Sequence, residues 1–173
     1  MRHGPDDLVA ALVKAAIAWL LACSATSWAA PTIVAARGQW AALNQGRTCE
    51  AAARSLGPTY KGRLPARASL SFDAGGPRRG QFAVRLSRVP RAGASVMLHV
   101  GEAPFLLMAR GDTAWSRGPA QEVAIVAAMR SAGGMRVEAR SPGGGRIVDR
   151  YSLAGAPLAI DAAAACAAAL ANR

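Results

Sequence analysis

The stretch that decides the fold runs from Arg146 to Cys166 and reads RIVDRYSLAGAPLAIDAAAAC. Its first part alternates apolar and polar side chains, which predicts a strand with Ile147, Tyr151 and Leu153 on one face. Gly155 then permits a sharp corner, and Pro157 suits the first position of a helix that follows it. This end of the chain is therefore expected to form a strand, a tight corner and a C-terminal helix that carries a cysteine.

The C-terminal helix predicts where its cysteine points. Side chains that recur at every fourth residue are expected to face the sheet. They are Leu158, Ala162, Cys166 and Leu170. Cys49 is the one plausible partner for Cys166, so we expect a disulfide between them, with two independent buried thiols as the alternative. Such a long loop gives at most roughly 4–5 kcal/mol of stabilisation in the chain-entropy account.

The N-terminus has the pattern of a secretory signal peptide over residues 1–29. An apolar core from Ala15 to Ala22 is followed by Ser27-Trp28-Ala29, with small residues at the two positions that a signal peptidase reads. Cleavage after Ala29 would leave one β-rich domain, residues 30–173, in the periplasm or secreted. Two alternatives remain: an uncleaved anchor over residues 8–22, and a lipoprotein site at Cys23. Anchoring in a membrane is expected only under those alternatives.

The chain is strongly basic. It has 21 basic and 10 acidic side chains, a net charge of +11, and all but two of the basic residues are arginine. Codon bias in a GC-rich genome is one explanation. Attraction to an anionic envelope component, such as lipopolysaccharide or phospholipid, is another, and a partner envelope protein is a further alternative. Nucleic acid is not an expected partner of an exported protein.

Short segments with alternating apolar side chains fill most of the chain and are separated by Gly- and Pro-containing turns. They cover residues 39–43, 48–54, 68–72, 82–86, 96–100, 105–108, 113–116 and 135–139. Residues 105–108 are continuously apolar, so we expect that strand to be buried on both faces. Residues 119–132 change to a helical period. The predicted fold class is mainly β (α+β): an antiparallel β-sandwich or partly open barrel with one mid-chain and one C-terminal helix.

Groups that could carry catalysis are scarce. His99 is the single histidine after residue 29, and no Gly-x-Ser-x-Gly elbow, phosphate loop or Cys-x-x-Cys is present. We expect no catalytic residues, no metal site and no cofactor. An enzyme or enzyme inhibitor of the cell wall, the alternative function, would need His99 to converge with Asp149 or Glu102 in one cleft.

Two charged features have specific expectations. Asp149 shares a strand face with apolar side chains, so we expect it to pair with an arginine on a neighbouring strand. A run of arginines on two turns and the strand between them could form a patch for anionic envelope polymers, with an ordinary solvated face as the alternative. This run comprises Arg78, Arg79, Arg85, Arg88 and Arg91.

The order of these elements resembles the invasion-associated locus B family of exported bacterial proteins. The resemblance is carried by a C-terminal motif in which Ser152, Leu153, Gly155 and Ala159 match, while Ala156 stands where the family has an aromatic residue. The family's further mid-chain cysteine pair has no counterpart here. The resemblance implies an envelope β-sandwich associated with host-cell contact in some pathogens. The sequence thus predicts an exported, non-catalytic envelope protein with a structural or binding role, or alternatively an outer-membrane lipoprotein anchored at Cys23.

Overall fold

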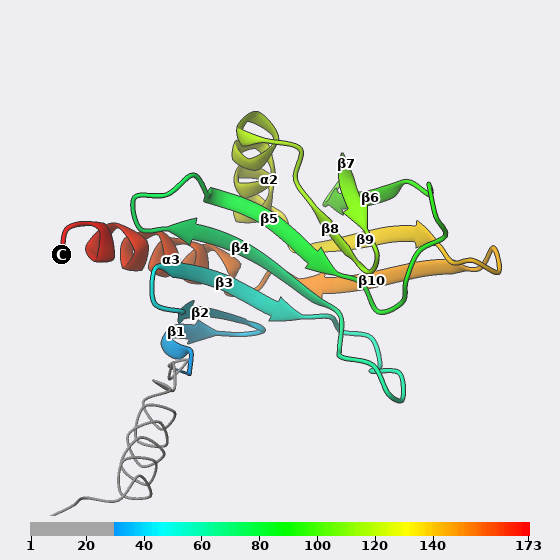
Figure 1. Cartoon of the computed structure of the whole chain (residues 1–173), viewed down its shortest axis with the longest axis horizontal. Coiled ribbons are helices and arrows are strands. Elements are labelled where there is room, and N and C mark those ends of the chain that lie inside the picture. The colour runs from blue at the N-terminus through cyan, green and yellow to red at the C-terminus, as the bar shows by residue number, and fades with distance from the viewer. Residues whose placement is uncertain (1–29) are drawn as a thin grey trace, which may run out of the picture.

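The computed structural model describes residues 30–173, and ten strands in this range pair into one antiparallel sheet with two helices packed against it (Figure 1). The predicted signal peptide, its cleavage point and the alternative lipid site at Cys23 lie outside the described residues.

The strands follow the order β1-β2-β3-β4-β5-β8-β7-β6-β9-β10 across the sheet. Their bounds are β1 Thr32–Arg37, β2 Trp40–Asn44, β3 Thr48–Arg54, β4 Arg67–Asp73, β5 Arg79–Arg85, β6 Val96–Val100, β7 Ala103–Arg110, β8 Thr113–Trp115, β9 Gly134–Arg140 and β10 Arg146–Ser152. The helices are α2 (Pro119–Ser131), between β8 and β9, and α3 (Ala156–Ala171), after β10.

The sheet curls on itself but stays open, because its edge strands β1 and β10 do not pair with each other. The backbone N–H of Leu56, just after β3, donates to the carbonyl oxygen of Arg150 in β10 (2.8 Å). This contact brings the last strand against the end of an early one. The prediction of a mainly antiparallel fold with a mid-chain and a C-terminal helix is confirmed, and the sheet is open rather than closed.

Alternation along each strand gives the sheet an inner and an outer face. In β4, the inner side chains Ala68 and Leu70 are fully buried, whereas Arg67 points to the outer face. Both helices and the hydrophobic core lie on the inner face. Trp40 and Tyr151 are among the largest buried side chains of this core, and it joins the two halves of the sheet.

Helix α3 covers the inner face of β1 to β4, but with a different stripe from the predicted one. The deeply buried residues are Ala156, Ala159, Ile160, Ala163 and Ala167. Ala162, Cys166 and Leu170 are only half-buried beside them, and Leu158 is 45% exposed. The prediction was wrong because a strict four-residue spacing drifts about 40° per step around a helix with 3.6 residues per turn.

The predicted disulfide between Cys49 and Cys166 is present, with a Cα–Cα distance of 6.0 Å. Cys49 is buried on the inner face of β3, and Cys166 comes from the flank of α3 that faces this strand. The bond ties the third strand to the last helix across 117 residues of sequence.

Strand β7 differs from its prediction. Of the expected doubly buried run, Leu107 alone is buried, and Met108 is 42% exposed. Leu107 pairs with Val96 on the inner face, so Leu106 and Met108 must point to the outer face, where Leu106 is half-buried and Met108 is exposed. A continuous apolar run therefore does not mean burial on both faces in this antiparallel sheet.

Candidate functional site

The five arginines of the predicted patch do not lie on one surface. Arg79 and Arg85 stand at opposite ends of β5, about 20 Å apart at the usual rise of a strand. Arg78 is held beside the turn before β5 by Asp73, with the closest contact at 2.7 Å. The hydrogen bond from Arg78 lowers the pKa of Asp73, which matches a closed ion pair.

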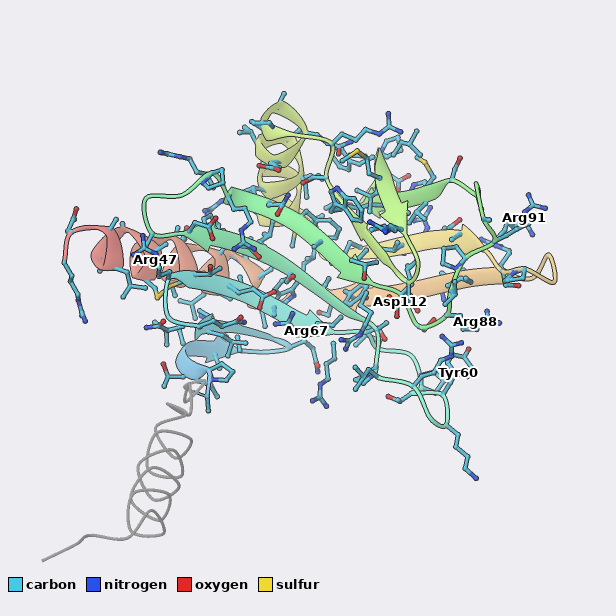
Figure 2. The ribbon with its side chains drawn as sticks, in the orientation of Figure 1. Arg47, Tyr60, Arg67, Arg88, Arg91 and Asp112 are labelled. Carbon is cyan, nitrogen blue, oxygen red and sulfur yellow. A yellow bond between two sulfur atoms is a disulfide. The ribbon has the colours of Figure 1, made fainter. Side chains whose placement is uncertain are left out.

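Arg88 and Arg91 lie instead next to the hairpin of β9 and β10. The Arg88 guanidinium donates to the carbonyl oxygen of Arg146 (2.6 Å), and the Arg91 N–H donates to that of Arg140 (2.7 Å). Arg88 also stands over the ring of Tyr60, 5.5 Å from its centroid (Figure 2). The loop after β5 therefore adds two arginines to the tip of this hairpin.

The outer face of β6, β9 and β10 carries a dense set of basic side chains, which we call the cationic face. In register, Arg136 stands opposite both Arg150 and His99, and Arg140 stands opposite Arg146. Directly opposed side chains lie about 5 Å apart. The cationic face consists of His99, Arg136, Arg140, Arg146 and Arg150.

Glu138 is the one acidic residue at the outward positions of these three strands. It accepts a hydrogen bond from Arg136 (2.8 Å) and a longer one from Arg146 (3.4 Å). The Arg136 hydrogen bond first, then the charges of Arg146, Arg136 and His99, hold the pKa of Glu138 below its ordinary value, although burial opposes this. Four arginines against one carboxylate leave the surface with a clear positive excess.

A hollow of about 490 Å³ opens at one end of the cationic face. His99, Arg136 and Arg150 line it together with Glu102 and Ser152. His99 and Glu102 thus share a hollow, which is one of the two convergences that the enzyme hypothesis required. No hydrogen bond or ion pair joins them within the described chain.

Asp149 does not join His99. It lies on the inner face of β10, 4% exposed, while His99 points outward from β6. The expected arginine partner was also wrong, because Asp149 accepts a hydrogen bond from the backbone N–H of Ser87 (2.9 Å) and forms no ion pair with any residue from 30 to 173. Asp149 therefore links β10 to the segment that follows β5.

Tyr151 is the other polar group on the inner face of β10. Its hydroxyl is buried and has no hydrogen-bond partner in the described region, and the side chain is 2% exposed. Burial, and next the charge of Asp149, raise the pKa of this phenol. Tyr151 therefore stays protonated and belongs to the core rather than to a reactive site.

Residues 30–173 contain neither a cluster of metal-ligating side chains nor a helix of membrane-spanning length. Among residues 30–173, no three His, Cys, Asp or Glu side chains are grouped closely enough to hold a metal ion. The helices in this range are also too short or too polar to cross a bilayer.

The family-like motif forms the corner between β10 and α3. The Ser152 carbonyl oxygen accepts the indole N–H of Trp40 (2.8 Å), and Leu153 is buried. Gly155 has φ +90° and no room for a Cβ, and Ala159 is fully buried on the side of α3 that packs on the sheet. Each matching residue therefore has a structural role in positioning the last helix.

The sequence contained a signal for the cationic face that went unused. Arg136 and Arg140 are outward positions of one strand, and Arg146 and Arg150 are outward positions of the next. A short hairpin loop joins the two strands, so antiparallel pairing had to bring the four together. The sequence could not predict that His99 joins these arginines, because β6 and β9 pair across more than thirty residues of sequence.

No protein-family model, curated protein or solved structure matches this chain. The resemblance to the invasion-associated locus B family thus rests on the corner motif and the order of the elements, and it remains a prediction.

Proposed function

We propose that this chain is an exported, non-catalytic protein of the bacterial envelope, as its resemblance to the invasion-associated locus B family implies, and that it binds anionic surfaces. The observation that carries the proposal is the cationic face on β6, β9 and β10. Arginine suits such a role because its planar fork binds phosphate and carboxylate groups in pairs.

The arrangement of like charges supports a binding role. Arginines placed directly opposite each other, as Arg140 and Arg146 or Arg136 and Arg150 are, destabilise a sheet. Glu138 neutralises only part of this charge. Such a surface lowers the stability of the free protein. It is expected at a binding site, where a bound anion removes the repulsion between the arginines.

The disulfide supports export. A buried Cys49 bonded to Cys166 fits a chain that folds in an oxidising compartment, since structural disulfides are rare in reducing cytoplasm. The test is expression of the full chain in a bacterial host and N-terminal sequencing of the periplasmic protein. A mature protein that begins at Ala30 is expected. A start at Cys23 with a diacylglycerol group would replace this proposal by the lipoprotein alternative.

The placement of His99 and Asp149 supports the absence of catalysis. They point to opposite faces of the sheet, so no histidine–carboxylate pair forms there. Glu102 shares the hollow of His99, but no hydrogen bond or ion pair joins the two side chains among the described residues. A binding surface therefore explains these residues more simply than an acid–base pair does.

Binding is tested by sedimentation with lipid vesicles. The mature protein should sediment with vesicles of mixed phosphatidylcholine and phosphatidylglycerol, and stay in solution with phosphatidylcholine alone. Each basic residue near an anionic surface contributes about 1 kcal/mol. Changing the four arginines of the cationic face to serine should therefore weaken binding on the order of 100-fold or more.

A matched control removes the same charge elsewhere. Four exposed arginines outside the cationic face serve this purpose: Arg54, Arg63, Arg110 and Arg117. Their conversion to serine should weaken binding far less. If both variants lose binding equally, net charge rather than the cationic face is responsible, and if neither variant loses any, anionic lipid binding by this face is excluded.

A further inference from the structure

We propose that a second site, the groove between α2 and α3, binds a free long-chain fatty acid, with the carboxylate on Arg79 and the alkyl chain along the apolar lining. This groove shares no residue with the cationic face, and it lies beside the turn between β4 and β5. It is therefore independent of the function proposed above.

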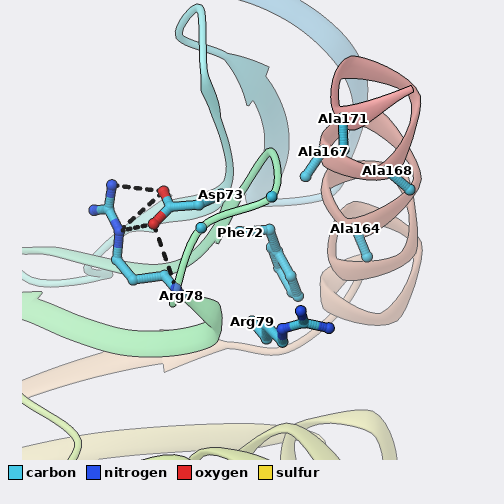
Figure 3. A pocket seen from close by; sticks show the side chains of 10 residues that line it. Phe72, Asp73, Arg78, Arg79, Ala164, Ala167, Ala168 and Ala171 are labelled. Atoms are coloured by element: carbon cyan, nitrogen blue, oxygen red, sulfur yellow. Dashed lines mark hydrogen bonds and ion pairs between the residues drawn. The ribbon is translucent and has the colours of Figure 1, made fainter. Parts of the chain in front are cut away.

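The groove consists of two hollows of about 290 Å³ each. Both are lined by Phe72, Arg79 and Ala164, so they adjoin at these three residues. One arm follows α3 towards Ala171, as Figure 3 shows. The other arm runs between the two helices. Two adjoining apolar hollows that follow the side of α3 offer space for a single alkyl chain.

Small side chains leave the groove open. The part of α3 that borders it carries alanines, among them Ala164, where larger residues would fill the space. Phe72 points inward from β4 but is only half-buried, because no side chain from α3 covers the whole ring. On the opposite wall, Val123 of α2 is 71% exposed. The protein thus leaves apolar surface uncovered in a concave position, which is typical of a ligand site.

Arg79 is the charged group that remains available in this groove. The neighbouring Arg78 is neutralised by Asp73 and points to the other side of the turn (Figure 3). Arg130, at the rim, is held by Asp161 at 2.6 Å. Arg79 makes no side-chain hydrogen bond or ion pair with the described residues. An apolar channel with one available guanidinium complements an apolar chain with one negative charge.

Other occupants fit this combination less well. A second copy of the chain, docked by two-fold symmetry, would place two Arg79 side chains near each other without a counter-charge. A peptide would bring backbone N–H and C=O groups that the alanine and valine side chains of the groove cannot bond. A fatty acid has no polar group apart from the carboxylate that Arg79 can bind.

The experiment measures displacement of a fluorescent fatty acid, 11-(dansylamino)undecanoic acid, from the disulfide-bonded mature protein. Saturable binding and competition by palmitate are expected. Hexadecyltrimethylammonium, which has the same chain length and the opposite charge, should compete at least about tenfold more weakly. Absence of saturable binding, or equal competition by the two amphiphiles, would overturn the proposal.

Variants locate the site. Ala164→Phe places a large side chain where the two arms meet and should abolish binding, whereas Ala165→Phe, on the exposed side of α3, should leave it unchanged. Arg79→Gln should weaken palmitate binding about tenfold, and Arg110→Gln should not. Circular dichroism checks the fold of each variant. Because Arg79 is exposed, Arg79→Gln tests the site even if Ala164→Phe does not fold.

The two proposals can fail separately. The variant without the four arginines of the cationic face should bind palmitate as the wild type does. Binding of palmitate that disappears in that variant and persists in Arg79→Gln would place the fatty acid on the cationic face and exclude the groove.

Discussion

Gly155 and Arg37 touch so closely that the corner before α3 admits no other residue than glycine. A Cβ built on Gly155 would lie 1.9 Å from the Arg37 carbonyl oxygen, and its φ of +90° already disfavours other residues. In the same contact, a Cβ on Gly38 would lie 2.4 Å from the Ala154 carbonyl oxygen. Two glycines therefore let the turn after β1 pack directly against the corner after β10.

This contact predicts a large loss of stability for Gly155→Ala. The substitution adds backbone strain and also forces β1 away from the corner, so we expect the free energy of unfolding to fall by at least about 3 kcal/mol. Gly144→Ala is the control, because Gly144 has a φ of +81° but no atom within 4 Å of its added Cβ. It should cost about 1–2 kcal/mol. Urea unfolding curves of both variants measure the difference, and equal losses would show that the contact contributes nothing.

The disulfide predicts a second large effect. The bond closes a loop across 117 residues of sequence, and the chain-entropy account gives about 4 kcal/mol or more for loops of this length. The double variant Cys49→Ala/Cys166→Ala should therefore unfold at a much lower urea concentration than the oxidised wild type. Reduced wild-type protein is the control, because it lacks the disulfide but keeps both cysteine side chains. If the oxidised and reduced proteins unfold at the same denaturant concentration, the bond does not stabilise the fold.

Glu50 predicts a pH dependence of stability. Burial alone would raise the pKa of this carboxyl, but hydrogen bonds from Arg67, Ser69 and Gln45 and the Arg67 charge lower it below its ordinary value of 4.5. A lowered pKa in the folded state means that the stabilisation is present above pH 4.5 and is lost as the pH falls through the folded pKa. Stability should therefore decline on acidification in this range.

The variant Glu50→Gln isolates this contribution. It should cost about 2 kcal/mol at pH 7, because Arg67 loses its charged partner. The difference from wild type should shrink as the pH falls below 4.5. Glu102→Gln, at an exposed residue without an ion pair in the described chain, should change stability little at pH 7. A difference between Glu50→Gln and wild type that stays constant down to pH 2 would contradict the role of this ion pair.

The two proposed sites predict different responses to salt. Binding of the cationic face to anionic vesicles depends on exposed charges, which salt screens over a Debye length of about 8 Å at physiological ionic strength. Raising NaCl from low to high concentration should weaken vesicle binding on the order of tenfold or more. Palmitate binding in the groove rests largely on apolar burial and should change much less. Vesicle binding that does not respond to salt would argue against the cationic face.

The strands were predictable because their period is local. Val96, Leu98 and Val100 alternate with polar or flexible neighbours, and all three are buried in β6. The disulfide was predictable for a similar reason, because few cysteines are available in the chain. Both inferences needed only composition and spacing.

Features that depend on distant pairing were not predictable. Asp149 bonds the backbone of Ser87, 62 residues earlier, and nothing in its neighbourhood indicates that partner. By contrast, the separation of Arg79 from Arg85 is local and could have been predicted, because it follows from their places at the two ends of one strand. The apolar run of β7 misled because alternation on an open sheet exposes every second residue, whatever its hydropathy.

The bond between Cys49 and Cys166 also sets an order of events during biosynthesis. Cys166 follows every strand of the sheet in sequence, so the covalent link cannot close until all of them have been synthesised. Until α3 docks, the inner side of β2 and β3 is bare and carries a free thiol. Another unfinished chain could be captured by that thiol, and the yield of correctly oxidised protein therefore depends on how soon the last helix follows the sheet.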